Sequence, residues 1–386
     1  AQTFVKLACA SIGKGFSVMD GVHIEGMGAL DGDYWLEGRG DDFLVVTALI
    51  DAPFESEGSV TVVRETPQMD FVLELDNRLW GCSSADHAIY ACKLGDPKNW
   101  NCFMGLSSDS YAMTVGSPGP FTGCVAHLGS VLFFKSDCIL RIYGTKPANF
   151  QLSTVHARGV SPGSAKSCAV LNETLYYLSA EGVLCCDGGV PVPFSRALSP
   201  LRLKNGCGAS YMGRYYLSAE DQNGDTHLFF YDEALGFWRR QDDTHARFAC
   251  VCDDLLYCID QDGVLWCEGG QSPYTFPDSH AEAPVPWRAL TPWLDLRDPY
   301  YKHVRRIVVR AQLFAGSTLC VRVRYDGDAQ FTTAAQFSAA QFSSVSVPIR
   351  PRRADRMRLE FSGTGQARIQ SLSRVCESGT ELGGRA

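Results

Sequence analysis

"FVLELDNRLWGCSSADHAIYACKL", residues 71–94, is a run of three short apolar segments separated by two polar turns. "FVLEL" predicts a strand, Asp76-Asn77 a turn, "RLWGCS" the returning strand, and "IYACKL" a third strand after the turn "SADHA". Pro97, in the "GDPKNW" that follows, suits a turn because its ring fixes φ. Asp86 and His87 then lie at a hairpin tip, where polar residues are expected. The stretch therefore predicts an antiparallel meander.

The same pattern of strand, turn, aromatic-rich strand, turn and strand recurs along the chain, in segments that begin at Val125, Ala169, Ala209 and Ala249. The first turns of the five segments are spaced 53, 43, 40 and 40 residues apart, at Asn77, Ser130, Glu173, Gly213 and Asp253. Repeats of roughly 40–50 residues with about four strands are typical of β-propeller blades. We therefore predict an all-β protein with a propeller of five visible blades. The pattern leaves open whether further blades complete the ring.

Three regions are expected. Residues 1–66 predict a small β module, either a separate barrel or part of an incomplete blade, and residues 67–286 predict the propeller. Residues 272–293 are rich in proline and predict a linker. In residues 287–386 apolar and charged residues alternate regularly along the predicted strands. Val321 and Val323 are expected to face one way, and Arg322 and Arg324 the other. Strands with one buried and one solvated face predict an antiparallel β-sandwich.

The composition is that of a folded protein, with 386 residues, 45% of them hydrophobic and 20% charged. No apolar run approaches the ~18 residues of a membrane-spanning helix, and the first residues lack a signal peptide's apolar segment, so we expect no membrane contact. The net charge of −8 is unevenly spread. Residues 301–386 hold 14 Lys and Arg against 6 Asp and Glu, whereas residues 1–300 hold 21 against 37. The two parts are expected to meet different partners or to attract each other.

The sixteen cysteines predict reduced core residues of a protein made in a cytosol, because many sit in apolar runs and so long a chain needs no disulfide staples. Cys250, Cys252, Cys258 and Cys267 match no usual zinc spacing. Cys250 and Cys252 alternate along a strand, which favours core packing. Residues 221–232 resemble a calcium loop but have Thr226 where its glycine belongs, so Asn223-Gly224 predicts a hairpin turn instead. No metal and no cofactor are expected.

Catalytic signatures are weak. There is no G-x-S-x-G motif and no P-loop, and Cys82 and His87 would need a proximity that a hairpin tip does not guarantee. Adjacent carboxylates such as Asp253/Asp254 point to opposite faces of a strand, a poor geometry for glycoside hydrolysis. We expect a protein that is not an enzyme and has no catalytic residues.

A cluster of five arginines lies in "RPRRADRMR", at Arg350, Arg352, Arg353, Arg356 and Arg358. Arg356 and Arg358 are expected on the solvated face of a strand whose other face carries Met357 and Leu359. We predict that the five bind a partner, with an acidic protein surface favoured over DNA. A plain solvated face remains open.

Several stretches carry a resemblance to known proteins: "PQMDFVLELDNRLWGCSS", "IYACKLGDPKNWN", "FTGCVAHLGSVLFFKSDCILRIYGTKPANFQL" and "PIRPRRADRMRLEFSGTGQARIQSLS". In these the chain resembles virion proteins of tailed bacteriophages and of prophages of gut Firmicutes. It is distantly similar to the packaged-DNA stabilisation and tail-tube-nozzle proteins of short-tailed phages.

The resemblance implies a non-enzymatic structural component of the neck or tail, made in the bacterial cytoplasm and located in the virion. Its partners would be other virion subunits, including copies of itself. Two alternatives stay open: a glycan-binding adhesion protein, which would need exposed rings such as Trp80, Trp100 or Trp238, and a propeller glycosidase, which would need carboxylates converging at the axis.

Overall fold

A computed structural model describes residues 3–53, 55–56, 58–268, 286–295, 302–338, 345–348 and 353–378. The chain divides into two compact units, residues 1–271 and 272–386. The described residues form antiparallel strands and four short 3₁₀ helices, η1 (Gly28–Leu30), η2 (Pro147–Asn149), η3 (Ala165–Ser167) and η4 (Ser199–Leu201). No helix in this part of the chain is long and apolar enough to cross a membrane.

The first unit begins with a five-stranded antiparallel sheet in the order β1-β4-β3-β2-β5. Its core is its own and contains Val5, Leu7, Ile24 and Leu44. The described residues of this region thus form one sheet with a core that no residue of the later sheets joins. The strands are β1 (Thr3–Ala8), β2 (Gly21–Glu25), β3 (Gly32–Gly40), β4 (Phe43–Ala48) and β5 (Thr61–Arg64).

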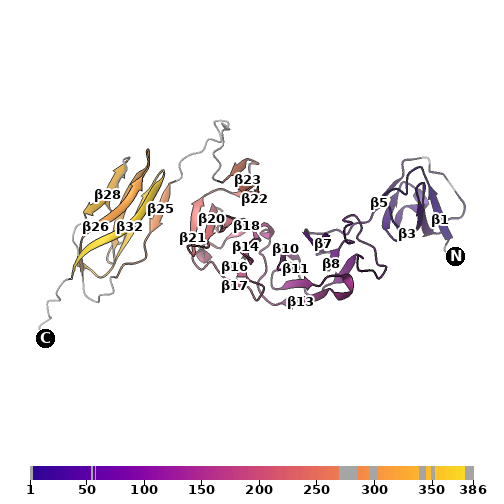
Figure 1. The fold of residues 1–386 in the computed structure, drawn as a ribbon, viewed down its shortest axis with the longest axis horizontal. Coiled ribbons are helices and arrows are strands. Elements are labelled where there is room, and N and C mark those ends of the chain that lie inside the picture. Colours follow the sequence, from indigo (N-terminus) through magenta and orange to yellow (C-terminus); the bar gives the residue numbers. More distant parts are fainter. Residues whose placement is uncertain are drawn as a thin grey trace. The chain divides into compact units, whose positions relative to one another are not determined.

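Five further sheets follow along the chain, and this series is the predicted propeller (Figure 1). The first four have four strands each, and the described part of the fifth has three. In chain order the sheets are β6 (Phe71–Leu75), β7 (Arg78–Ser83), β8 (Ala88–Ala91) and β9 (Tyr111–Thr114); β10 (Phe121–His127), β11 (Ser130–Lys135), β12 (Ile139–Tyr143) and β13 (Gln151–Val155); β14 (Ala169–Leu171), β15 (Thr174–Ser179), β16 (Gly182–Cys186) and β17 (Val192–Pro193); β18 (Lys204–Tyr211), β19 (Arg214–Glu220), β20 (Thr226–Asp232) and β21 (Phe237–Asp242); and β22 (Ala246–Cys252), β23 (Leu255–Asp260) and β24 (Leu265–Cys267).

The first two strands of every sheet are joined by a two-residue turn in which both residues have positive φ. Such turns match the right-handed twist of the strands they join and favour Asn, Asp and Gly. Four of the five turns contain the predicted position, at Asp76-Asn77, Asn172-Glu173, Met212-Gly213 and Asp253-Asp254. The second turn is Leu128-Gly129, directly before the predicted Ser130, which is the first residue of β11.

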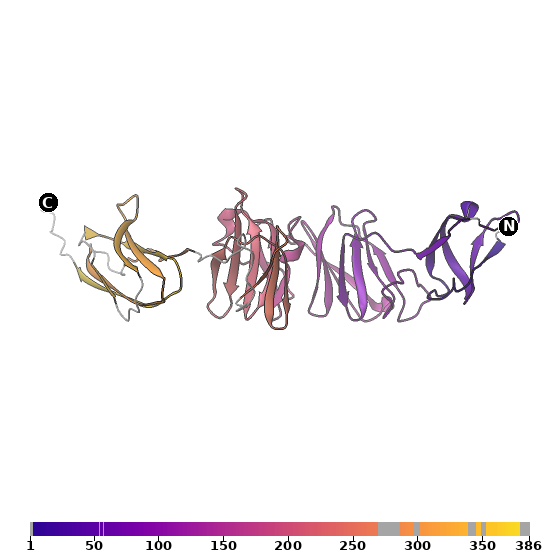
Figure 2. The same ribbon diagram turned by 90° about the horizontal axis from the view of Figure 1, so that it is seen from above.

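The blades pack face to face because their second strands are apolar on both sides. In β11, Val131 and Phe133 join the core with the first sheet, whereas Leu132 and Phe134 join the core with the third. In the second, third and fourth sheets, the first strand (β10, β14 and β18) lies on the inner side of the series and the last strand (β13, β17 and β21) on its outer side (Figure 1). The sheets stand side by side when seen from above (Figure 2).

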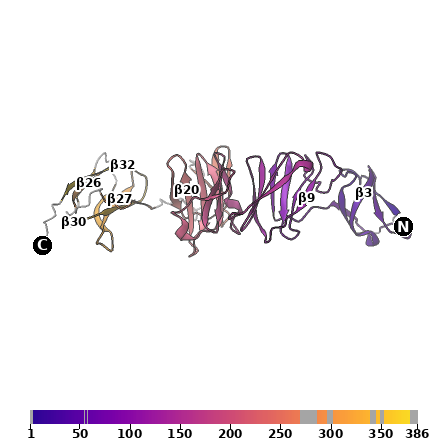
Figure 3. The ribbon, with the colours of Figure 1, turned by 90° about the horizontal axis from the view of Figure 1, so that it is seen from below.

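The second unit is the predicted sandwich, with two sheets in the orders β25-β31-β27-β28 and β29-β26-β30, where β32 also pairs with β26. Ile307 and Val309 of one sheet share a core with Val321 and Leu359 of the other. Figure 3 labels β26, β30 and β32 of one sheet and β27 of the other. The predicted alternation of β27 is confirmed, with every second residue buried. The strands are β25 (Trp287–Leu290), β26 (Lys302–Leu313), β27 (Thr318–Tyr325), β28 (Thr332–Ser338), β29 (Val345–Pro348), β30 (Arg353–Ala354), β31 (Met357–Gly363) and β32 (Ala367–Ser378).

Candidate functional site: the loop between β8 and β9

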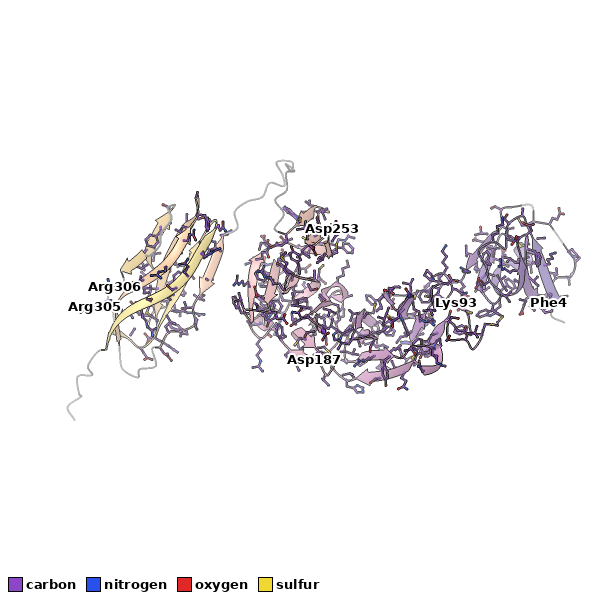
Figure 4. The ribbon with its side chains drawn as sticks, in the orientation of Figure 1. Phe4, Lys93, Asp187, Asp253, Arg305 and Arg306 are labelled. Carbon is purple, nitrogen blue, oxygen red and sulfur yellow. The ribbon has the colours of Figure 1, made fainter. Side chains whose placement is uncertain are left out.

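The connection from β8 to β9, residues 92–110, is the longest one within the propeller sheets. The sequence predicted a strand through Leu94, but β8 ends at Ala91. Loops without secondary structure that exceed about 12–15 residues are usually functional. Lys93 lies at the start of this loop (Figure 4).

Arg78 of β7 holds the loop from inside. Its side chain is 3% exposed and donates to three loop carbonyl oxygens, those of Cys92 at 2.7 Å, Asp109 at 2.6 Å and Ser107 at 2.9 Å. Burial lowers the pKa of Arg78, but a guanidinium stays charged at any physiological pH. Hydrogen bonds from a charged donor are about twice as strong as neutral ones, so these three fix the path of the loop.

Two more buried polar residues tie the loop together. The Asp109 carboxylate accepts a hydrogen bond from the Leu106 backbone N–H at 2.9 Å and lies 3.7 Å from Cys102 Sγ. Asn99 Nδ2 donates to Asp20 Oδ1 at 2.6 Å and so links the loop to the N-terminal module. The loop is therefore an ordered element with a polar interior.

The outer surface of the loop is apolar. Phe103, Met104 and Leu106 are 50%, 57% and 60% exposed, and Leu94 lies exposed on the same loop. Large apolar side chains that gather on an ordered surface mark binding sites for proteins or ligands. Buried charged side chains therefore hold the loop in a conformation that exposes apolar side chains to solvent.

A hollow of about 400 Å³ lies between this loop and η2. The residues that line it include Phe103, Leu106, Ser110, Tyr111 and Lys146, together with Asp109. Both Asp109 oxygens already have partners within the loop, as given above. The hollow therefore offers two aromatic rings, hydroxyl groups and one ammonium group, but no pair of free carboxylates.

The arginine cluster is only partly described. Arg350 and Arg352 lie outside the described residues, and Arg353 is described only as part of β30. The exposed Arg356 guanidinium stacks 5.1 Å from the Trp293 ring, and Arg358 is half-buried with Nε donating to the Thr291 carbonyl at 2.6 Å. The role of these arginines in binding a partner stays a prediction.

The face that carries Arg356 and Arg358 is less solvated than expected. Glu360, on the same face of β31, is 1% exposed. It accepts hydrogen bonds from Arg288 Nε at 2.8 Å and from Arg322 Nη1 at 2.6 Å. Burial by itself raises the pKa of Glu360, but the bonds from the two arginines outweigh it, so the pKa lies below its usual value.

The calcium-like segment is a hairpin, as predicted. The Asp221 carboxylate accepts from the backbone N–H of Asn223 at 2.8 Å and of Asp225 at 3.0 Å, closing the turn between β19 and β20. Across the described part of the chain, no three His, Cys, Asp or Glu side chains are grouped to hold a metal ion. Cys82 is fully buried between the first two sheets, whereas His87 is exposed at its hairpin tip.

Cys250 and Cys252 share a strand face, but the expectation that they pack in the core is wrong. Both are exposed. The face of β22 that carries them looks away from the fourth sheet and bears no further blade within the described residues.

The glycan-binding alternative required exposed tryptophan rings, and the glycosidase alternative required carboxylates that converge at the propeller axis. The described residues show neither arrangement. Trp80 and Trp100 are buried, and Trp238 packs among Tyr215 and Tyr231. Along the innermost strands β6, β10, β14, β18 and β22, Glu74 is the single carboxylate in the described residues. Aromatic rings for a glycan are instead at Phe103 and Tyr111, which sequence reasoning missed. The signal that could have found them is the long stretch after Ala91 without strand alternation.

No protein-family model matches the sequence, and no curated protein sequence matches it. Solved structures similar to this chain include BamB from Moraxella catarrhalis, at 16% identity and a TM-score of 0.37, over 56% of this chain and 62% of that one. An exo-β-1,3-galactanase from Phanerochaete chrysosporium with β-1,3-galactotriose is 9% identical with a TM-score of 0.30, over 80% and 97% of the two chains. Hsv2 from Kluyvelomyces marxianus is 10% identical with a TM-score of 0.34, over 61% and 68%. This chain thus covers less than two thirds of BamB.

The expectation that this chain is not an enzyme is corrected by these comparisons. It rested on the lack of catalytic motifs, but the similar structures include a galactanase, which is an enzyme. None of the three structures is described as a phage protein.

Proposed function

We propose that this chain is a structural component of a tailed-phage particle and that its β8–β9 loop binds a neighbouring protein subunit. The single observation that carries the proposal is the exposed apolar trio Phe103, Met104 and Leu106 on a loop held by buried Arg78. The resemblance to virion proteins supplies the biological setting.

The order of the loop favours a protein partner. A loop that is already fixed by Arg78 and Asp109 loses little conformational entropy when it binds, so more of the apolar burial appears as affinity. Met104 adds an unbranched side chain that adapts to the surface of a partner. Lys146 at the hollow's edge gives one charge that an acidic group of the partner can pair with.

The test is particle assembly with a double variant, Phe103→Ser with Leu106→Ser. Both side chains are at least half exposed, so the fold should persist while incorporation into particles falls about tenfold or more. Leu235→Ser, at an exposed position in the β20–β21 turn, is the matched control and should assemble normally. Normal incorporation of the double variant, or absence of the chain from purified particles, would contradict the proposal.

Glycan binding is a second candidate, favoured by the two rings and the hydroxyl groups in the hollow. Sugars stack on aromatic faces while hydroxyl groups and charged side chains bind their polar edges. A glycan array with the parent chain and Tyr111→Ala distinguishes the two functions: binding lost in the variant would place a saccharide in the hollow. Turnover of aryl glycosides by the parent chain, abolished by one Asp or Glu substitution, would establish the glycosidase.

A further inference from the structure

The fifth propeller sheet has one face that consists of apolar side chains. Cross-strand pairing places Phe248 opposite Ile259 and Cys250 opposite Tyr257, and Leu265 pairs with Ile259 on the same face. Phe248, Ile259 and Leu265 are 47%, 37% and 54% exposed. Asp253, in the β22–β23 turn, locates this sheet in Figure 4. Patches of this kind on a folded domain mark interaction surfaces.

The equivalent face of every earlier sheet is covered by the next blade. In the third sheet, Tyr177 packs toward the second sheet and Tyr176 toward the fourth, where it stacks on Tyr215 at 5.2 Å. In the fifth sheet, Leu256 packs toward the fourth sheet, but Tyr257 enters no core formed by the described residues. Within the described residues, no further sheet of the first unit packs on the apolar face of the fifth sheet.

The outer face of the first sheet is open at Val72 and partly filled at Gly81, where Met69 packs. Trp80 and Cys82 of β7 pack toward the second sheet, whereas Leu79 and Gly81, on the other side of the strand, join no shared core within the described residues. Val72 of β6 is 49% exposed on this outer side, and Glu74 is its neighbour there. Among the described residues, no sheet thus packs on the outer face of the first sheet or on the outer face of the fifth, the two ends of the series.

We propose that the face of the fifth sheet that carries Ile259 and Leu265 docks onto the face of the first sheet that carries Val72, in a second copy of this chain. The contact continues the blade-to-blade packing that the chain repeats four times within itself, so its chemistry is set by the existing interfaces. It is a head-to-tail contact in which each copy uses two different surfaces, and repetition produces a closed ring or a filament.

A mixing experiment with two charge variants tests the proposal on the full chain. Leu265→Lys blocks the fifth sheet and Val72→Lys blocks the first, and each position is about half exposed, so both variants should fold like the parent by circular dichroism. Native mass spectrometry should show oligomers for the parent, monomers for each variant alone, and a one-to-one dimer when the two are mixed, because the mixture retains one intact interface. Leu235→Lys is the control and should associate like the parent.

Thiol protection gives a second readout. Cys250 lies on the proposed interface, so iodoacetamide should modify it several-fold more slowly in the parent at a concentration that favours oligomers than in Leu265→Lys. A parent that stays monomeric across about a hundredfold range of concentration would overturn the proposal. Self-association of Val72→Lys equal to that of the parent would also overturn it, because a face-to-face contact between two fifth sheets does not use Val72.

Discussion

Asp20 Oδ1 accepts a hydrogen bond from Asn99 Nδ2 at 2.6 Å, although the two residues are 79 positions apart in the chain. Asp20 is 1% exposed and forms an ion pair with Arg64 at 2.8 Å. The N-terminal module is therefore joined to the β8–β9 loop through one buried carboxylate whose partners come from both.

Replacing Asp20 by Ala should destabilise this junction by about 3–5 kcal/mol, because removal of one member of a buried pair leaves the other charge without its partner. Calorimetric unfolding of the first unit measures the loss. Asp33→Ala is the control: Asp33 pairs with His23 at an exposed site, and its loss should cost less than about 1 kcal/mol. Equal effects of the two substitutions would contradict the structural role of Asp20.

Arg78→Met should release the β8–β9 loop while keeping most of the side chain's volume. Three backbone carbonyl groups lose a charged donor, so we expect a loss of about 3 kcal/mol or more and faster hydrogen exchange across residues 92–110. Lys98→Met, at an exposed position of the same loop, should leave exchange unchanged. Unchanged exchange in Arg78→Met would show that the loop is held by other contacts.

Thiol reactivity should separate the cysteines by burial. Cys9, Cys250 and Cys252 are exposed, and alkylation of the native, monomeric chain should modify them first. Burial raises the pKa of Cys207 to about 11 and that of Cys124 to about 12, which leaves almost no thiolate at neutral pH. Peptide mapping after brief alkylation checks the order, and early modification of Cys207 would show that its blade opens.

Glu360 should make the second unit sensitive to acid. Its pKa is lower in the folded chain than the usual 4.5, so the stabilisation from Arg288 and Arg322 is complete above that value. It is lost as the pH falls through the lower folded pKa. Calorimetry between neutral and acidic pH should show a shallower acid decline for Glu360→Gln, together with about 1.5–3 kcal/mol lower stability at neutral pH. Parallel pH profiles for variant and parent would refute the assignment.

Arg356 is the best exposed described member of the predicted arginine cluster. Arg356→Ser should leave the melting temperature nearly unchanged and weaken incorporation into particles, more strongly as salt is raised. Arg368→Ser, at an exposed position on β32, serves as the matched control. If both variants assemble like the parent, the arginine face is only a solvated surface.

Much of the fold could be predicted from local sequence patterns. The two-residue turn at Asp76-Asn77 and its four counterparts were predictable because their backbone favours Asn, Asp or Gly and lies between apolar runs. The β8–β9 loop was not predictable in the same way. Arg78 looks like an ordinary strand residue in the sequence, and its three carbonyl partners come from positions up to 31 residues away.

The sequence by itself determined the strands, their turns and the alternation of their side chains, since these depend on neighbours within a few residues. Only the tertiary structure decided which apolar sheet faces are covered by a neighbouring sheet. Leu132 and Tyr257 are the third residues of β11 and β23, and both lie on the face turned away from the preceding sheet. Within the described residues only Leu132 joins a core with a following sheet, because the third sheet packs on that face of β11. It likewise decided that Glu360 is buried between two arginines that come from neighbouring strands. Burial is set by what packs on a face, and that neighbour is remote in sequence.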